Sequence, residues 1–372
     1  MALIDKITAI AVAIREKTGT EDKLTLDQMA TAIAGIETGG EGLQEIVLTG
    51  DISYAFGEGR LQSFIDSYKD HLTSKNITKA DSVAYNYKGT VFPIDINFDT
   101  VNYQTGNATM FKYARTMVET GKITNLVGYV GSMFENCSKL KHANLVTPHA
   151  GRIYGERMFY ACNALRTIPS EALSKIYISE EAGESYCKYN YTLFSYGFFG
   201  CYCLDELVGL YPPDIKLDST GNAFTNTFTN CEHIKDVIFA TQEDGTPYVR
   251  NWCRQTLTCA GSAFGYGGSF SYHSGIGSDK RVDSVTKYES LKNDPDWYAS
   301  SKEYSRFNHD SAVRTINSLP DCSAAIAGDG SNINTISFNK DAGSATDGGA
   351  ISTLTEEEIA VATAKGWSVV LV

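Results

Sequence analysis

The sequence predicts an α/β repeat protein: a short N-terminal helical hairpin, an irregular solenoid of stacked coils with loop insertions, and a C-terminal cap. Three observations support this prediction. Apolar residues recur at helical spacing near the N-terminus, a Phe, Cys and Leu motif recurs in the middle, and a helix signal precedes a strand signal at the end. We place the helical module at 1–38, the repeat region at 43–300 with insertions 177–202 and 241–298, and the cap at 301–372.

The composition narrows the classes of function. The chain of 372 residues carries a net charge of -12, which disfavours the phosphate backbone of nucleic acids and anionic lipid surfaces. The first residues lack the basic stretch of a signal peptide, and no window is apolar for long enough to cross a membrane. We therefore expect no nucleic-acid partner, no membrane insertion and synthesis in the cytoplasm. The nine cysteines do not form a compact secreted framework, so we expect them to be reduced.

The first element is a pair of short amphipathic helices. Thr25 and Gln28 have the spacing of a capping box at the start of the second helix, and a glycine-rich break follows at 38–42. Two helices of this length bury too little to be stable alone, so we expect their apolar face to pack against copies of itself or another protein. The residues of that face are Leu3, Ile7, Ile10, Ile14, Leu26, Met29 and Ile33.

After the break, the β-rich segment 43–48 predicts a strand that belongs to the repeat region. The repeat itself is Phe-x-x-Cys-x-x-Leu/Ile, usually followed three residues later by another apolar residue. A degenerate copy begins at Phe111, and the steps between the Phe positions are 23, 25, 39 and 30 residues. The four clear copies begin at Phe134, Phe159, Phe198 and Phe228, with Cys137, Cys162, Cys201 and Cys231 three residues later.

This motif resembles the BspA-type leucine-rich repeat. The resemblance implies an α/β solenoid in which each coil contributes a short strand and a turn, and neighbouring coils bury a continuous core. We expect the Phe residues to form one buried ladder and the Cys residues another, because Cys is a small and frequently buried residue. Long steps between copies imply loop insertions, which often lie on a binding face.

We find no catalytic or metal-binding constellation in the sequence. The cysteines show no Cys-x-x-Cys spacing with paired histidines, so we predict no metal and no cofactor. His233 lies inside a repeat, and we expect it at the rim. Acidic pairs such as Glu180 and Glu181 have no fixed separation that would indicate a glycosidase. We therefore predict that the chain is not an enzyme.

The C-terminal segment predicts a helix and a strand. Thr355 and Glu358 have the spacing of a second capping box, Lys365 and Gly366 stop the helix, and the apolar run from Trp367 reads as a strand. Such a segment would cover the last coil of a solenoid.

Both ends of the chain resemble proteins of bacteriophages and prophages. The run IAVAIREKTG at 10–19, with KLTLDQM at 23–29, is similar to the N-terminal module of virion structural proteins from Gram-positive hosts. The run LTEEEIAVATAKGW at 354–367 is similar to the closing segment of phage-encoded leucine-rich-repeat proteins. The resemblance implies a virion protein that attaches to other virion proteins through its N-terminus. By analogy with tail fibres, we expect a homo-oligomer, with a trimer favoured.

The leading hypothesis is a tail-tip or fibre adhesin that binds a host-surface glycan or protein through its insertions. Large aromatic side chains supply rigid contact area in binding surfaces. A head fibre or a capsid or tail decoration protein is the alternative; a host-side adhesin and a glycan depolymerase fit less well. The candidate receptor-binding residues are Tyr186, Tyr189, Tyr191, Tyr196, Tyr266, Phe270, Tyr272, Trp297 and Tyr298.

Overall fold

The computed structural model describes residues 45–47, 95–97, 111–124, 128–129, 131–146, 153–168, 196–212, 214, 224, 226–259, 277–294 and 296–372. The chain divides into two compact units, Met1–Gln44 and Glu45–Val372. The predicted N-terminal helices and the seven residues of their apolar face lie outside the described residues, so that prediction stays open.

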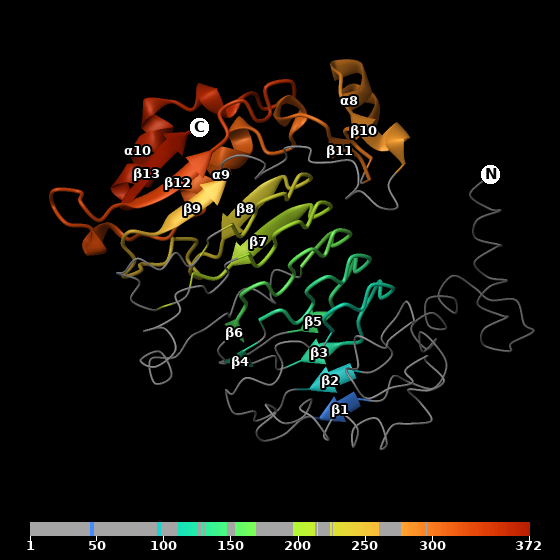
Figure 1. The fold of residues 1–372 in the computed structure, drawn as a ribbon. Helices are drawn as coiled ribbons and strands as arrows, with labels where there is room; N and C mark the ends of the chain where they lie inside the picture. The colour runs from blue at the N-terminus through green and yellow to red at the C-terminus, as the bar shows by residue number, and fades with distance from the viewer. Residues whose placement is uncertain are drawn as a thin grey trace, which may run out of the picture. The chain divides into compact units, whose positions relative to one another are not determined.

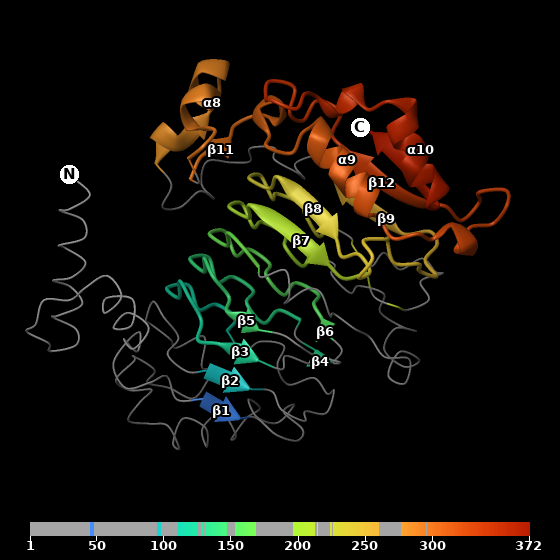
Figure 2. The same cartoon turned by 180° about the vertical axis from the view of Figure 1, so that it is seen from behind.

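The second unit is built on parallel strands (Figures 1 and 2). β1 (Glu45–Val47) lies inside the segment predicted as a strand, and it pairs with β2 of the same sheet as the first repeats, as expected. The order in that sheet is β1-β2-β3-β5, and every pair of named strands in the described part is parallel. The other strands up to β8 are β2 (Asp95–Asn97), β3 (Ile123–Thr124), β4 (Gly128–Tyr129), β5 (Leu145–Val146), β6 (Ile153–Tyr154), β7 (Glu206–Leu210) and β8 (Asp236–Phe239).

The repeats stack in register, and the predicted Phe ladder is confirmed. The rings of Phe111, Phe134, Phe159, Phe198 and Phe228 stack in that order, with centroids 5.1–6.1 Å apart and planes within 10° of parallel. All five rings are buried. The four repeat cysteines are also buried, and they are free thiols.

The three-residue spacing of the motif follows from its backbone hydrogen bonds. In each repeat, the Cys N–H donates to the Phe carbonyl and the Leu or Ile N–H donates to the Cys carbonyl, which makes two successive i→i+3 turns. Side chains three residues apart eclipse in such turns, so Phe, Cys and Leu point into the core together. Each Cys also donates its Sγ–H to the Phe carbonyl of the preceding repeat, over 2.8–3.2 Å.

Each of the four clear repeats also has two residues in the left-handed backbone region, two places before and two places after its Phe. In the repeat of Phe159 these residues are Arg157, at φ 56°, and Ala161, at φ 57°. Up to the repeat of Phe198, the N–H of the later residue donates to a carbonyl of the next repeat; Ala161, for example, bonds to Phe199 over 2.7 Å. Most of these positions hold a residue other than glycine, which costs free energy locally, so the bonds between repeats must hold the conformation.

Helices replace the tight turns at the C-terminal end. The predicted capping box between Thr355 and Glu358 is confirmed, and so is the strand from Trp367. α9 packs on β8, and α10 packs on α9 and β13. The elements are β9 (Thr256–Cys259), α9 (His309–Ser318), η5 (Ser323–Ala325), β12 (Asn334–Phe338), η6 (Ile351–Thr353), α10 (Glu356–Ala364) and β13 (Trp367–Leu371).

β9 differs from the sequence-based expectation. Its residues fall in the segment 241–298, which we expected to be an insertion, yet they form one sheet with two strands of the cap in the order β13-β12-β9. The repeat motif is absent here, but Trp252 and Leu257 are fully buried in the same apolar core as the repeat Phe residues. This part of the predicted insertion therefore continues the stack.

A small subdomain lies between β9 and α9 in the sequence. It has a separate apolar cluster formed by Val282, Tyr288, Trp297 and Ala299. Its elements are η3 (Ser278–Lys280), β10 (Arg281–Val282), α8 (Val285–Leu291), β11 (Tyr298–Ala299) and η4 (Lys302–Tyr304).

Candidate binding surface

A row of side chains outside the apolar core follows the tight turns of the stack. Each stands one place after a repeat Phe, two places before it or, in the case of Tyr113, two places after it. The stacking of the repeats therefore brings such side chains from successive repeats together. We call this set the turn row; its members are Lys112, Tyr113, Glu135, Arg157, Tyr160, Tyr196 and Phe199.

Three aromatic members of the turn row contact one another. The rings of Tyr160 and Phe199 stack with centroids 4.9 Å apart, and Tyr196 lies 5.6 Å from Phe199 at a tilted angle. The Arg157 guanidinium lies 4.1 Å from the centroid of Tyr160. Tyr160, Tyr196 and Phe199 are half-buried, and Tyr113 is 37% exposed. These rings present partly exposed edges and faces to which a sugar or a partner side chain could bind.

Charges in the turn row are balanced around Glu135. Its carboxylate lies 3.0 Å from both Lys112 Nζ and Arg157 Nη2, and the side chain is only 5% exposed. Burial opposes the charged form, but hydrogen bonds from Ser132, Lys112 and Arg157 outweigh that effect and lower the pKa of Glu135. The carboxylate therefore holds both cations beside the aromatic rings.

The structure separates the predicted receptor-binding residues. Tyr196 is the one candidate within the described ranges that lies in the turn row. Tyr186, Tyr189, Tyr191, Tyr266, Phe270 and Tyr272 lie outside the described residues. Trp297 and Tyr298, which we expected in an exposed insertion, are 1% and 3% exposed.

The burial of Trp297 corrects two expectations at once. Its ring lies 5.2 Å from His233 and 5.8 Å from Tyr288, so it fixes the small subdomain to the last repeat. His233 is consequently 2% exposed and is not a rim residue. Ion pairs of Arg166 with Asp296 and of Arg306 with Asp205 reinforce the same attachment. A long insertion needs such contacts to offset the entropy of ordering it.

Sequence reasoning missed Tyr113, Tyr160 and Phe199, although a signal was present. Tyr160 and Phe199 each stand directly after a repeat Phe, so an alignment of the repeats would have placed them in the same column. Tyr113 stands two places after Phe111 and falls in the next column.

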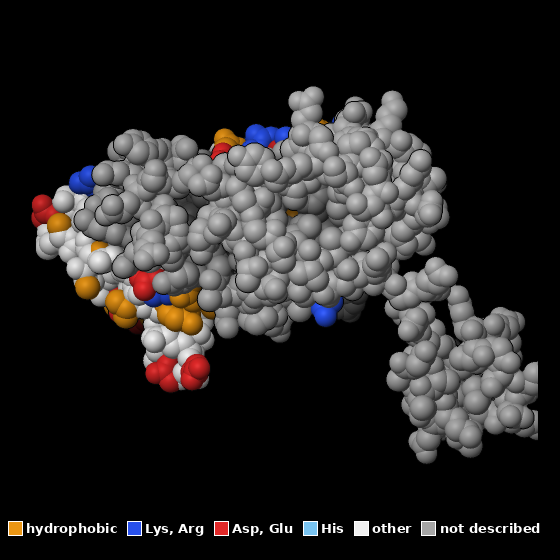
Figure 3. Space-filling model, turned by 90° about the horizontal axis from the view of Figure 1, so that it is seen from below, with side chains coloured by type: hydrophobic (Ala, Val, Ile, Leu, Met, Phe, Trp, Pro, Cys, Tyr) orange, Lys and Arg blue, Asp and Glu red, His pale blue; other side chains and the backbone are white. Residues whose placement is uncertain are grey.

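Other exposed apolar side chains are distributed over several elements. On the face seen in Figure 3, hydrophobic side chains of the described part lie beside carboxylates. The exposed apolar side chains include Val249, Val285, Val361, Val370 and Val372.

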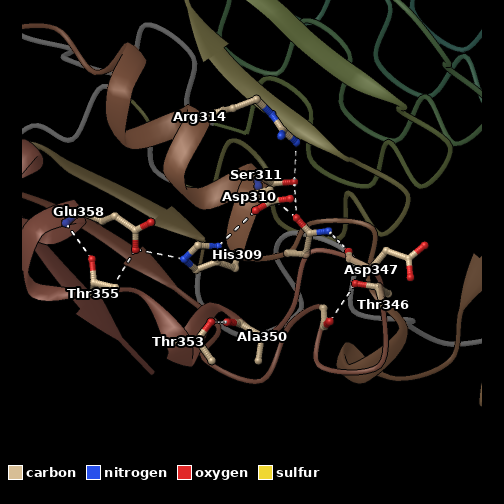
Figure 4. A network of polar contacts seen from close by, with 12 residues as sticks. His309, Asp310, Ser311, Arg314, Thr346, Asp347, Ala350, Thr353, Thr355 and Glu358 are labelled. Carbon is tan, nitrogen blue, oxygen red and sulfur yellow. Dashed lines mark hydrogen bonds and ion pairs between the residues drawn. The ribbon is translucent and has the colours of Figure 1, made fainter.

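The C-terminal segment holds a second polar network (Figure 4). His309 lies between two acids, with Nε2 3.0 Å from Glu358 Oε2 and Nδ1 3.3 Å from Asp310 Oδ1. Burial opposes the imidazolium, but the hydrogen bonds to both acids outweigh it and raise the pKa of His309. The same Glu358 oxygen accepts the Thr355 N–H over 2.8 Å, which contributes to lowering the pKa of Glu358.

This network resembles an acid–histidine pair of a hydrolase, but its partners identify it as a helix-capping arrangement. Asn308 caps α9 by accepting the Ser311 N–H, and the Ser311 hydroxyl bonds the same oxygen over 3.1 Å. Arg314 reaches Asp236 of β8 over 2.7 Å. The contacts therefore join α9, α10 and β8 into one cap.

The chemistry of the described residues is otherwise sparse. Among them, no group of three or more His, Cys, Asp or Glu side chains is arranged to hold a metal ion. Burial raises the pKa of the Cys137 thiol to about 12 and raises the pKa of Cys162 and Cys201 as well. No helix in the described ranges is both long and apolar enough to cross a membrane. No family model, curated protein or solved structure matches the chain.

Proposed function

We propose that this chain is a non-enzymatic adhesin of a bacteriophage virion. In this proposal, the stacked repeats are a BspA-type leucine-rich-repeat solenoid that binds a glycan or protein on the surface of a Gram-positive host. The N-terminal module attaches the chain to other virion proteins and makes it a homo-oligomer, most simply a trimer.

Support for the phage origin comes from the two terminal sequence runs, 10–29 and 354–367, described above. Support for the repeat family comes from the in-register Phe and Cys ladders and the parallel strands between them. Repeats of this kind place side chains at fixed intervals along a surface, which suits recognition of extended ligands.

The turn row is the observation that carries the binding function. The core needs the Phe, Cys and Leu of each repeat but not the residue beside them. Tyr113, Tyr160, Tyr196 and Phe199 are nevertheless aromatic and partly exposed, and cations lie against the rings of Tyr113 and Tyr160. Rigid aromatic side chains next to charged groups are enriched at binding hot spots.

The test measures binding of the fluorescently labelled full chain to cell walls from a panel of Gram-positive bacteria. A Tyr160→Ala/Tyr196→Ala double variant should bind at least about tenfold more weakly than the unmodified chain, since hot-spot aromatics contribute this much or more. A Val249→Ser/Val285→Ser double variant is the matched control, because it removes two apolar side chains that are 59% and 54% exposed elsewhere.

Equal binding by both double variants, measured at a temperature at which each variant is fully folded, would exclude the turn row as the site. Failure to bind any wall preparation would favour the alternative of a head fibre or decoration protein. Release of reducing ends from the wall glycans by the purified chain would instead indicate a depolymerase.

A further inference from the structure

The last strand of the structure has one open side. β13 is the outer strand of the order β13-β12-β9, and within the described residues it pairs with β12 alone (Figure 1). Val372 N–H donates to Phe338, and the carbonyls of Gly366 and Val372 accept from Asn334 and Lys340. In a parallel strand, alternate residues direct both backbone groups to the same neighbour, so the even-numbered residues of β13 face β12.

It follows that the odd-numbered residues direct their backbone groups to the open side. Trp367, Val369 and Leu371 thus offer three N–H and three C=O groups to a further strand. None of the three is proline, and the run 367–372 has no charged residue. Exposed strand edges usually carry Lys, Pro or a bulge that prevents pairing with another chain. This edge carries none of these features, which indicates that it pairs with a further strand.

The apolar core is also incomplete at this edge. Ile336 and Phe338 of β12, which lie between two strands, are fully buried. Their register partners on β13, Val369 and Leu371, are only partly buried although they pack on the same core. The side chain of Val370 lies on the opposite face of β13, and it is also incompletely covered, with 38% of its surface exposed.

We infer that β13 is a dimer interface that pairs antiparallel with β13 of a second copy of this chain. An antiparallel pair centred on Val369 places Trp367 opposite Leu371 of the other copy, so every outward donor meets an acceptor around a two-fold axis. The uncharged run also suits self-association of a chain whose net charge is -12, because most other surfaces would bring acidic side chains together. This inference is independent of the proposed adhesin function.

A strand pair of this length buries a small area, so we expect a dissociation constant in the micromolar range, about 1–100 μM. The test uses residue-resolved amide hydrogen exchange of the full chain below and above that concentration range. The amides of Trp367, Val369 and Leu371 should become protected only at the high concentration. The amides of Ser368, Val370 and Val372 should be protected at both concentrations, since β12 holds them.

Val370→Lys should abolish the concentration-dependent protection, because it adds a cation to each strand at the interface. Val285→Lys on α8 makes the same chemical change at a position that is 54% exposed, and it should leave the protection unchanged. Self-association through the N-terminal module would raise the mass in sedimentation without protecting the β13 amides. Exchange at the three outward amides that stays independent of concentration, or a loss of protection in Val285→Lys alone, would overturn the inference.

Discussion

Replacement of Phe159 by Ala tests whether the Phe ladder is the main support of the stack. The ring is fully buried, and it lies between Phe134 at 5.1 Å and Phe198 at 5.5 Å. Loss of a buried Phe side chain costs about 3–5 kcal/mol, and two stacked ring contacts add about 0.5–1.5 kcal/mol each. We therefore expect Phe159→Ala to lower the free energy of unfolding by about 5 kcal/mol or more. A loss of that size approaches the whole stability of an ordinary domain.

The assay is urea unfolding followed by tryptophan fluorescence, since Trp252, Trp297 and Trp367 are all buried and will report the transition. Phe159→Leu keeps most of the volume and should cost only about 1–2 kcal/mol. Tyr160→Ala removes the adjacent, half-buried ring of the turn row and should cost roughly 1–2 kcal/mol. If Phe159→Ala costs less than Tyr160→Ala, the Phe ladder does not carry the stability that we assign to it.

Three further predictions concern the thiols, the backbone and pH. Alkylation at pH 8, resolved by peptide mapping, should leave Cys137, Cys162 and Cys201 unmodified in the native chain, because burial raises the pKa of each thiol; rapid labelling of any of them would contradict the ladder. Ala161→Gly should raise the free energy of unfolding by about 0.5–1 kcal/mol and Gly200→Ala should lower it by about 1 kcal/mol, because both positions have positive φ; opposite signs in urea unfolding would refute the backbone argument. The raised pKa of His309 means that its contribution to stability is present below its ordinary value of 6.5 and is lost as pH rises through the folded-state pKa, whereas the lowered pKa of Glu358 means that its contribution is present above 4.5 and is lost as pH falls. His309→Gln should therefore reduce stability most between pH 4.5 and 6.5. If the melting temperature of this variant differs from that of the unmodified chain by the same amount at every pH from 4 to 8, the contact between His309 and Glu358 does not contribute to stability.

The sequence was sufficient for features that depend on local spacing. The offsets within each repeat predicted the Phe and Cys ladders, because a three-residue spacing is a property of the turn itself. Thr355 and Glu358 predicted the start of α10 for the same reason. The β-rich run at 43–48 predicted β1.

Features that depend on distant partners could not be predicted. β9 has four residues, and it becomes a strand because it pairs with β12, whose register partner for Leu257 is Ile336. Trp297 is buried because His233 lies beside it, and nothing in its own neighbourhood in the sequence indicates that contact. Some left-handed positions hold Asn or Gly, which favour this conformation, but others hold Arg157, Tyr196 and Ala161, so residue type marks only part of them.

The bonds between neighbouring repeats have a consequence for how such a chain can change over evolution. The donors of the hydrogen bonds between repeats all lie within a few residues of a repeat Phe. They are backbone N–H groups beside the Phe and the Cys Sγ–H, which bonds to the Phe carbonyl of the preceding repeat. The chain between one Phe and the next can therefore grow or shrink without shifting the register of these bonds. The unequal steps of 23, 25, 39 and 30 residues are what such tolerance permits. Segments between repeats can thus acquire insertions and diversify quickly, while the stack that carries them is inherited unchanged.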